Sequence, residues 1–440
     1  MDRVWKTVIT VAAACLFLCG CSVLTVDEMY YPPKRSEAFD NLQSVMDAAM
    51  SGLEYCAPLS GENQQNVQMA DLNGDGTNEY LLFAKGTEDR PLRILVFGGK
   101  DGSYSHIQTI ECSGSAFDQV EYVNMDNTPG MEIVVGRQLN DQVIRSVSVY
   151  SLRRDGLEQL VSVNYTKFLT VDLDNNMLHE LFVLRPGQTD ADEGVAELYA
   201  IKNGSMERSN EVNMSRPADK LKRIITGGID EEIPAVFVAS MVDETALVTD
   251  IFILSGDLLK NVTFSNESGT GVQTMRNFYV FADDIDNDGV VELPALISMK
   301  PRADGVHEDR HHLIRWYAMT KDGREIDKMY TFHNFVAGWY LQLDSRWAPR
   351  VSVETFGNSY EFYLWNKEYK KTEKILTITA LTGQNREEQA LESGRFVLLR
   401  TESTVYTAKL EEGAQTLSLS QDSVIYSFRM IQQDWKTGET

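Results

Sequence analysis

The chain has 440 residues, of which 43% are hydrophobic and 24% are charged. This composition is typical of proteins that bury folded cores, and it excludes global disorder. The 65 acidic and 41 basic residues give a net charge of -24, which would repel a nucleic-acid backbone and excludes that class of partner. Five cysteines are too few for a small scaffold built on disulfides.

Residues 1–20 have the pattern of a signal peptide. Arg3 and Lys6 precede an uncharged apolar stretch over residues 8–18, which is shorter than the ~20 residues that span a bilayer. The sequence Leu-Cys-Gly-Cys at 18–21 resembles the lipobox of bacterial lipoproteins. The resemblance implies cleavage before Cys21 and a lipid on its thiol, so we expect a lipid-anchored chain on the extracytoplasmic face of the bacterial cell membrane. An ordinary signal peptide is the alternative.

Residues 21–58 are expected to form a lipidated tether followed by a helix. Pro32 and Pro33 disfavour helix in the tether. Ser36 suits the N-cap of a helix, and Gly52 suits its end. Between them, apolar residues recur at helical spacing at Phe39, Leu42, Met46, Ala49 and Met50. We expect this helix to pack on the domain that follows.

An acidic nine-residue motif recurs along the middle of the chain. It is clearest at residues 71–79, which read Asp-Leu-Asn-Gly-Asp-Gly-Thr-Asn-Glu, and at 284–292, which read Asp-Ile-Asp-Asn-Asp-Gly-Val-Val-Glu. Weaker copies make five starts, at residues 71, 124, 172, 228 and 284, which we call the first to fifth acidic loops. A fixed period of about fifty residues is the signature of a repeat architecture.

Apolar runs and glycine-containing turns keep the same period. Each acidic loop lies between two apolar runs, a third run follows, and a turn such as Asn203-Gly204 precedes a fourth. Four strands per period match a blade of a β-propeller, so we expect a mainly β chain with a propeller over residues 59–336. The predicted strands include residues 67–70, 80–83, 94–97, 107–110, 147–150, 168–171, 181–184, 198–201, 251–254, 262–264, 278–282, 293–297 and 313–317.

These loops resemble FG-GAP and VCBS repeats, which occur in the propellers of integrin α-chains and in many bacterial surface proteins. The first and fifth loops carry the resemblance most specifically. It implies an integrin-α-like β-propeller, and the length of the repeat region favours five blades. A ring of seven blades, with two degenerate blades supplied by residues 337–440, is the alternative.

The residue types in the acidic loops predict bound calcium. Oxygen ligands at positions 1, 3, 5 and 9 of a tight turn can face one centre, and calcium prefers ~6–8 oxygen ligands. An EF-hand is excluded, because its position 12 requires Glu and is Leu82 or Ala295 here. The expected ligands are Asp71, Asn73, Asp75 and Glu79 in the first loop, Asp172, Asp174, Asn176 and Glu180 in the third, and Asp284, Asp286, Asp288 and Glu292 in the fifth.

The loops differ in how well they fit this chemistry. Met177 stands where the third loop should have glycine, and Thr128 and Val236 replace carboxylates in the second and fourth loops. We expect any bound calcium to be structural, because it would hold a turn and activate no water. The alternative is a set of solvated turns without an ion, shaped by Asx-turn hydrogen bonds.

Residues 337–440 are expected to form a small α+β domain. Strand-like runs occupy residues 351–354, 360–365, 375–381, 396–400 and 405–410. A helical face follows, made of Val424, Ile425, Phe428, Ile431 and Trp435. The stretch over residues 338–353 faintly resembles PsbP-like domains, which would make this region a cap on five blades.

Other groups carry less chemistry. His307, Glu308, Asp309, His311 and His312 could bind zinc, but a solvated loop is the favoured interpretation. Whether Cys56 and Cys112 pair stays open.

Nucleophile, phosphate-loop and dinucleotide motifs are missing from the sequence, so we favour a surface binding or scaffolding module, with a protein or glycan ligand, over an enzyme. The alternatives are an accessory subunit of a cell-envelope complex and an extracellular glycan-active enzyme with its site at the propeller axis.

Overall fold

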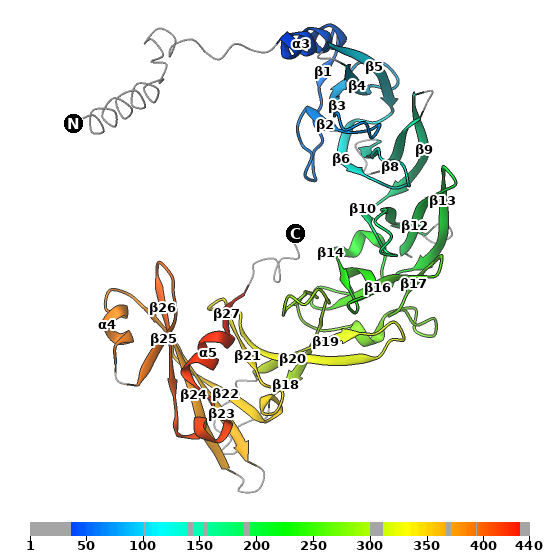
Figure 1. Ribbon diagram of the computed structural model, residues 1–440. Helices are drawn as coiled ribbons and strands as arrows, with labels where there is room; N and C mark the ends of the chain where they lie inside the picture. Colours follow the sequence, from blue (N-terminus) through cyan, green and yellow to red (C-terminus); the bar gives the residue numbers. More distant parts are fainter. Residues whose placement is uncertain are drawn as a thin grey trace, which may run out of the picture. The chain divides into compact units, whose positions relative to one another are not determined.

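The computed structural model describes residues 37–100, 103–139, 144–153, 156–187, 194–299, 311–366, 371–392 and 394–431. These residues form antiparallel β-sheets with few helices (Figure 1), which confirms the expected mainly β class. The predicted signal peptide, Cys21 and the tether lie outside the described residues. Among the helices that are described, none combines the length and the apolar character needed to cross a membrane.

The first of two compact units contains a helix and one sheet. Helix α3 (Glu37–Ala49) follows the predicted helical pattern, and its buried Leu42 and Met46 pack with Leu82 and Phe97 of the sheet. An apolar stripe on one side of a surface helix explains this packing. The strands of this first-repeat sheet are β1 (Glu54–Tyr55), β2 (Val67–Ala70), β3 (Glu79–Lys85), β4 (Leu92–Lys100) and β5 (Ser103–Cys112).

The second unit begins with three four-stranded sheets in which each strand pairs with the next along the chain. The second repeat contains β6 (Ala116–Val123), β7 (Glu132–Gln138), β8 (Arg145–Arg153) and β9 (Gly156–Tyr165). The third contains β10 (Lys167–Val171), β11 (Glu180–Pro186), β12 (Gly194–Lys202) and β13 (Ser205–Asn213). The fourth contains β14 (Leu221–Gly228), β15 (Pro234–Met241), β16 (Leu247–Ser255) and β17 (Leu258–Asn261), with short 3₁₀ helices η1 (Ala218–Lys220) and η2 (Val272–Thr274) on either side.

Consecutive sheets of the second unit share cores, so a central strand is buried on both faces. In β11, Leu181 and Val183 belong to the core shared with the second repeat. Phe182 and Leu184 belong to the core shared with the fourth repeat. Because successive side chains of a strand point to opposite faces, a strand buried on both faces has a continuous apolar sequence. This packing explains the uninterrupted apolar runs of the repeats.

The fifth repeat forms a sheet whose outer strands come from beyond the expected domain boundary. Strand β21 pairs with β20 on one side and with β27 on the other. The expected domain boundary between residues 336 and 337 therefore lies in the connection between β20 and β21, which are paired strands of one sheet. The strands are β18 (Leu293–Ser298), β19 (His312–Met319), β20 (Glu325–Asn334), β21 (Trp339–Leu343) and β27 (Phe428–Met430).

A sixth antiparallel sheet contains all five strand-like runs predicted after residue 350. It shares a large apolar core with the fifth sheet, in which the Phe332 and Phe362 rings meet edge to face at 5.3 Å. The blade number stays a prediction. The elements are η3 (Ala348–Arg350), β22 (Val351–Phe356), β23 (Ser359–Asn366), β24 (Lys371–Thr382), α4 (Arg386–Ala390), β25 (Arg395–Arg400), β26 (Thr404–Leu410) and η4 (Glu412–Leu417).

The C-terminal helix is shorter than the sequence predicts. Helix α5 (Gln421–Ser427) ends before Phe428, which begins strand β27. There the Phe428 ring packs 5.4 Å from the Trp339 ring, and the strand pairs with β21. Strand pairing therefore replaces the last helical turns, and Trp435 lies outside the described residues.

The predicted strand over residues 278–282 is wrong, although its central residues are buried. The carbonyl oxygen of Val280 accepts a hydrogen bond from Arg276 Nε at 2.8 Å. The carbonyl oxygen of Ala282 accepts one from Arg223 Nη1 at 3.3 Å. Arginine side chains take the place that a neighbouring strand would have filled.

The predicted strand over residues 262–264 is also wrong. Strand β17 begins directly after the turn at Gly256 and ends at Asn261. The Asn261 side-chain oxygen accepts the Thr263 N–H at 3.3 Å, so a local turn follows the strand.

The remaining cysteine and histidine candidates have ordinary surroundings. Cys56 and Cys112 are thiols in the structure, so they form no disulfide with each other. His311 contacts the Thr355 hydroxyl at 3.1 Å and meets the Phe332 ring edge to face. The other expected members of the zinc cluster, residues 307–309, lie outside the described residues.

Candidate metal sites in the acidic loops

Neighbouring acidic loops are joined by hydrogen bonds in chain order within the second unit. The links run from Met131 N–H to Asp71 O at 3.0 Å, from His179 N–H to Asn124 O at 2.9 Å, from Asn175 Nδ2 to Glu232 O at 2.9 Å, and from Gly228 N–H to Gly289 O at 2.9 Å. Each loop is therefore joined to the next, and the five loops form one series.

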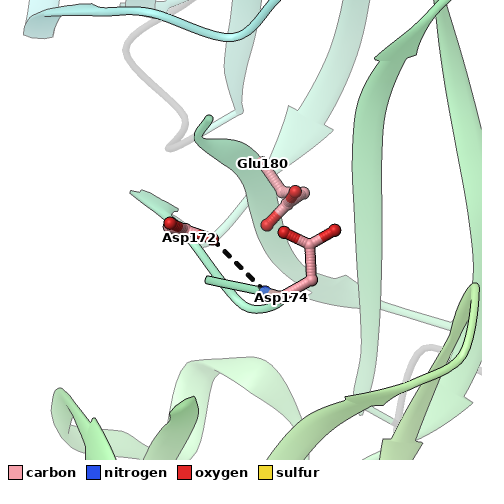
Figure 2. Close-up of side chains that lie close together, drawn as sticks. All are labelled: Asp172, Asp174 and Glu180. Carbon is pink, nitrogen blue, oxygen red and sulfur yellow. Dashed lines mark hydrogen bonds between the residues drawn. The ribbon is translucent and has the colours of Figure 1, made fainter. Parts of the chain in front are cut away.

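The third loop folds around Asp172. Its carboxylate accepts the N–H groups of Asn176 and Met177 at 3.2 and 2.8 Å. Met177 occupies the position expected for glycine and adopts the left-handed φ of +69° that this position requires. The turn brings carboxylate oxygens of Asp172, Asp174 and Glu180 within 4.8 Å of one another, with Asp174 and Glu180 facing each other (Figure 2).

Asn176, an expected ligand, is used by the loop itself. Its Oδ1 accepts the Leu178 N–H at 2.7 Å, and its Nδ2 donates to Asp174 Oδ2 at 3.0 Å. The side chain therefore holds Asp174 in place and is engaged on both sides.

Glu180 is the innermost carboxylate of the third loop. Its side chain is buried at the start of β11, and Oε2 accepts the Leu173 N–H at 2.9 Å. Burial raises the Glu180 pKa to about 7, and the neighbouring carboxylates of Asp174 and Asp172 add to the effect. A nearby cation would favour the ionised form.

The fifth loop repeats this geometry. The Asp284 carboxylate accepts the N–H groups of Asp288 and Gly289 at 3.0 and 2.9 Å, which are the equivalents of the Asn176 and Met177 bonds. Gly289 has a φ of +86°. The second three-carboxylate group, made of Asp284, Asp286 and Glu292, has oxygens within 4.8 Å of one another.

Glu292 is fully buried at the end of this loop. Its Oε2 accepts the Ile285 N–H at 3.1 Å, whereas its Oε1 has no hydrogen-bond partner among the described residues. Burial raises the Glu292 pKa to about 8. A buried carboxylate oxygen without a donor is costly, and a cation between Glu292 and the two aspartates would relieve that cost.

Asp288, the remaining expected ligand of the fifth loop, pairs with a lysine. Lys328 Nζ, from strand β20, lies 2.7 Å from Asp288 Oδ2. Burial opposes ionisation of Asp288, but the hydrogen bond from Lys328 holds its pKa below the usual value. The ion pair explains why Asp288 is not part of the three-carboxylate group.

In the second loop, protein side chains supply what an ion would provide. Glu132, at the last position, accepts the Met125 N–H and the Ser151 hydroxyl, both at 2.8 Å. Arg153 Nη1 lies 3.1 Å from Asp126 Oδ2. A guanidinium and a hydroxyl therefore satisfy the two acidic side chains.

The fourth loop has no carboxylate at its last position, where Val236 is buried in strand β15. The N–H of Ile229, equivalent to that of Leu173 or Ile285, donates to the carbonyl oxygen of Ile233 at 3.0 Å. A backbone bond thus replaces the glutamate.

The first loop belongs to both units, with Asp71–Asp75 in the second and Glu79 in the first. Within its own unit, Asp71 Oδ1 accepts the Gly74 N–H at 2.7 Å and Asn73 Oδ1 accepts the Asp75 N–H at 2.8 Å. The expected Asx turns are present, and binding of an ion by the first loop stays a prediction.

The third and fifth loops can hold a metal ion. Carboxylates alone form a hard oxygen donor set, which suits Ca²⁺, Mg²⁺ or Mn²⁺ better than metals that prefer sulfur ligands. The preference for calcium among these ions stays a prediction.

Sequence reasoning missed Lys328 and Arg153. Both are basic residues on strands, 40 residues after Asp288 and 27 after Asp126 respectively. Neither belongs to the acidic motif, and only strand pairing brings them to it. A basic residue near the end of a repeat's third strand, as at Arg153, is the one signal that could have suggested such a contact.

No family model and no curated protein matches this chain. Among solved structures it resembles an exotype rhamnogalacturonan lyase, at 12% identity and a TM-score of 0.30 over 66% of this chain and 74% of the other. A Bacillus licheniformis rhamnogalacturonan lyase matches at 10% identity and 0.30, over 70% and 84%. A Lactobacillus plantarum protein matches at 9% identity and 0.24, over 72% and 86%. Likeness at these scores carries no argument about fold or function.

Proposed function

We propose that this chain is a lipid-anchored binding module on the extracytoplasmic face of the cell membrane, with its repeat sheets arranged as a β-propeller and its acidic loops stabilised by calcium. The observation that carries the metal part is the buried Glu292 carboxylate, which groups with those of Asp284 and Asp286 and whose Oε1 lacks a hydrogen-bond partner among the described residues. Calcium would bind there between loops that contact each other in series.

The packing of the sheets supports a module that binds through its connections. Apolar cores between consecutive sheets occupy both faces of the central strands, as in β11. The ends of the strands and the connections between them are then the surfaces left for a ligand, as is common for loops on a rigid scaffold. A structural ion in an acidic loop would fix one set of these connections.

Calcium titration of the purified full-length chain by isothermal titration calorimetry tests the metal part. Wild type should bind calcium at the third and fifth loops, and Glu292→Gln should bind one equivalent fewer. Glu132→Gln is the matched control, because Glu132 has the same position in the second loop but is satisfied by Met125 and Ser151. Equal stoichiometry in wild type and Glu292→Gln, or no calcium uptake by wild type, would contradict the proposal.

Metabolic labelling with an alkyne fatty acid, followed by membrane fractionation, tests the anchor. Cys21→Ser should lose both the label and the membrane fraction. Cys19→Ser, two residues earlier in the same motif, should keep both. Labelling that survives Cys21→Ser would show that the lipid is attached elsewhere or that the anchor is of another kind.

A further inference from the structure

A cavity lies at the junction of the second and third repeats, at the strand ends away from the acidic loops. Strand β8 ends near the second loop with Arg153, whereas its first residue, Arg145, lines the cavity. Strand β11 begins at Glu180 of the third loop, and Arg185 near its other end lines the cavity. The volume is about 530 Å³, within the ~300–1,000 Å³ typical of sites for small ligands.

The cavity lining is basic and aromatic, although the whole chain is strongly acidic. Its charged members are three arginines and one glutamate, and two tyrosines form part of the wall. These residues are Arg145, Arg185, Arg208, Glu197, Tyr165 and Tyr199. Two further carboxylates reach these arginines from outside the lining, because Glu211 lies 2.6 Å from Arg185 Nη2 and Asp118 lies 3.8 Å from Arg145 Nε. An anionic ligand is therefore indicated by the arginine donors that stay free, and not by net charge.

Glu197 organises this cluster from beneath. Its carboxylate is 1% exposed and accepts Arg185 Nε at 3.0 Å and Nη2 at 2.7 Å, a two-point contact that fixes the guanidinium plane. It also accepts Arg208 Nη1 and the Tyr199 hydroxyl. A carboxylate with this many donors is fully satisfied and has no capacity to neutralise further charge.

Donors remain for a ligand after these contacts. Arg208 uses Nη1 for Glu197, and its Nε and Nη2 make no hydrogen bond with the described residues. Arg145 Nε is buried without a hydrogen-bond partner among them, and the carboxylate of Asp118 lies 3.8 Å away. Guanidinium groups left with free N–H pairs suit a carboxylate or a phosphate.

The rest of the wall favours a sugar over a bare anion. The buried rings of Tyr165 and Tyr199 lie beside Val163 and Pro186, and together they supply the apolar surface against which a saccharide ring can pack. Asn164 adds an exposed amide for hydroxyl groups. A phosphate ion would use the arginines but gain nothing from this surface.

We propose that this cavity binds an acidic saccharide, with Arg145 and Arg208 contacting a uronate carboxylate and the tyrosine wall contacting the sugar ring. The inference gives the ligand class of the binding module and in that sense rests on the proposed function. Arg145 and Arg185 lie at the strand ends away from the acidic loops, whereas Arg208 also lines a second pocket that includes Asp174 and Glu180 of the third loop. The test therefore includes a readout of the metal sites.

The test compares two tetrasaccharides that differ only in charge. Galacturonate tetramer and galactose tetramer have the same ring stereochemistry, with a carboxylate or a hydroxymethyl group at C5. Calorimetric titration of the full-length chain should show at least tenfold tighter binding of the acidic tetramer. Arg145→Gln combined with Arg208→Gln should weaken that binding at least tenfold, whereas Arg400→Gln, an exposed arginine on β25, should leave it unchanged.

Three further readings decide the outcome. The double variant should keep the wild-type calcium stoichiometry and a cooperative unfolding transition, with a lower melting temperature because Arg208 also donates to the buried Glu197. These readings separate loss of the ligand from loss of the fold or of the metal sites. Inorganic phosphate at the same concentration should compete poorly with the tetramer. Equal binding of the two tetramers, no binding of either, an unaffected double variant or full competition by phosphate would each overturn the proposal.

Discussion

The Lys328 ammonium nitrogen lies 2.7 Å from Asp288 Oδ2 and 3.9 Å from Glu292 Oε1, so a strand of the fifth repeat brings a positive charge to its acidic loop. In the second loop, Arg153 of β8 pairs with Asp126 at 3.1 Å. The third loop has no such cation among the described ion pairs of its three carboxylates. The loops thus form a graded set, from one whose aspartate pairs with a guanidinium to one whose carboxylates make no ion pair within the described residues.

Lys328→Gln should increase the metal affinity of the fifth loop about tenfold. The ammonium group repels a divalent ion bound a few ångströms away, and removing it also frees Asp288 as a ligand. Calorimetric titration of calcium into the purified chain gives the change, and Lys321→Gln, an exposed lysine of the turn that precedes β20, is the control. An affinity that falls in Lys328→Gln would mean that the lysine positions the loop.

Met177→Gly should stabilise the third loop by up to about 1 kcal/mol. A non-glycine residue in the left-handed region costs ~1–2 kcal/mol, part of which is offset by the greater freedom of glycine in the unfolded chain. Met177 is 85% exposed, so removing its side chain forfeits little packing. Urea unfolding measures the change. Met177→Ala removes most of the side chain but keeps the strain, and a gain of the same size in that variant would refute the backbone explanation.

Much of the repeat structure could be predicted from the sequence because local and tertiary signals agree there. The run over residues 168–171 ends at an acidic turn and the run over 181–184 follows it, and these segments are strands β10 and β11. The alternating burial of β11 against two different cores produces the continuous apolar pattern. The turn chemistry then fixes where each strand stops, since Asp172 collects the backbone N–H groups of the loop.

The wrong strand and helix predictions share a cause, which is hydrogen-bond partners that the apolar pattern of the sequence does not reveal. The apolar run at 278–282 looks like a strand, but Arg276 and Arg223 occupy its carbonyl groups. The predicted helix after residue 421 ends early because Phe428 belongs to strand β27, which pairs with β21. Neither the arginine hydrogen bonds to the run at 278–282 nor the strand pairing of Phe428 can be predicted from the local sequence.

Gly74→Ala should destabilise the chain by roughly 2–4 kcal/mol, which tests the contact between the first and second loops. An added Cβ would lie 2.4 Å from Pro129 Cβ, and the left-handed φ of +73° adds strain. Gly204→Ala is the matched control, since its φ is +80° but nothing lies within 4 Å of the added carbon. Thermal unfolding should show a clearly smaller loss in Gly204→Ala. Equal losses would mean that the two loops do not touch.

Glu197 should make a large contribution to stability that depends on pH. Burial raises its pKa, but the hydrogen bonds from Arg185, Arg208 and Tyr199 outweigh that effect and lower the pKa from 4.5 to about 2. Because the folded pKa is depressed, the contribution is fully present above pH 4.5 and is lost as the pH falls from 4.5 towards 2. Its size is about 3 kcal/mol by the linkage relation.

Urea unfolding of wild type and Glu197→Gln between pH 7 and pH 3 measures this contribution. The variant should have the lower free energy of unfolding at pH 7. The difference in free energy of unfolding between the two proteins should shrink by about 2 kcal/mol at pH 3, because most of the stabilisation linked to ionisation of Glu197 is lost by then. Glu207→Gln changes an exposed residue of the same β12–β13 hairpin and should keep the wild-type pH dependence. A difference in free energy of unfolding between wild type and Glu197→Gln that stays constant with pH would show that the arginines bind Glu197 no better than water does.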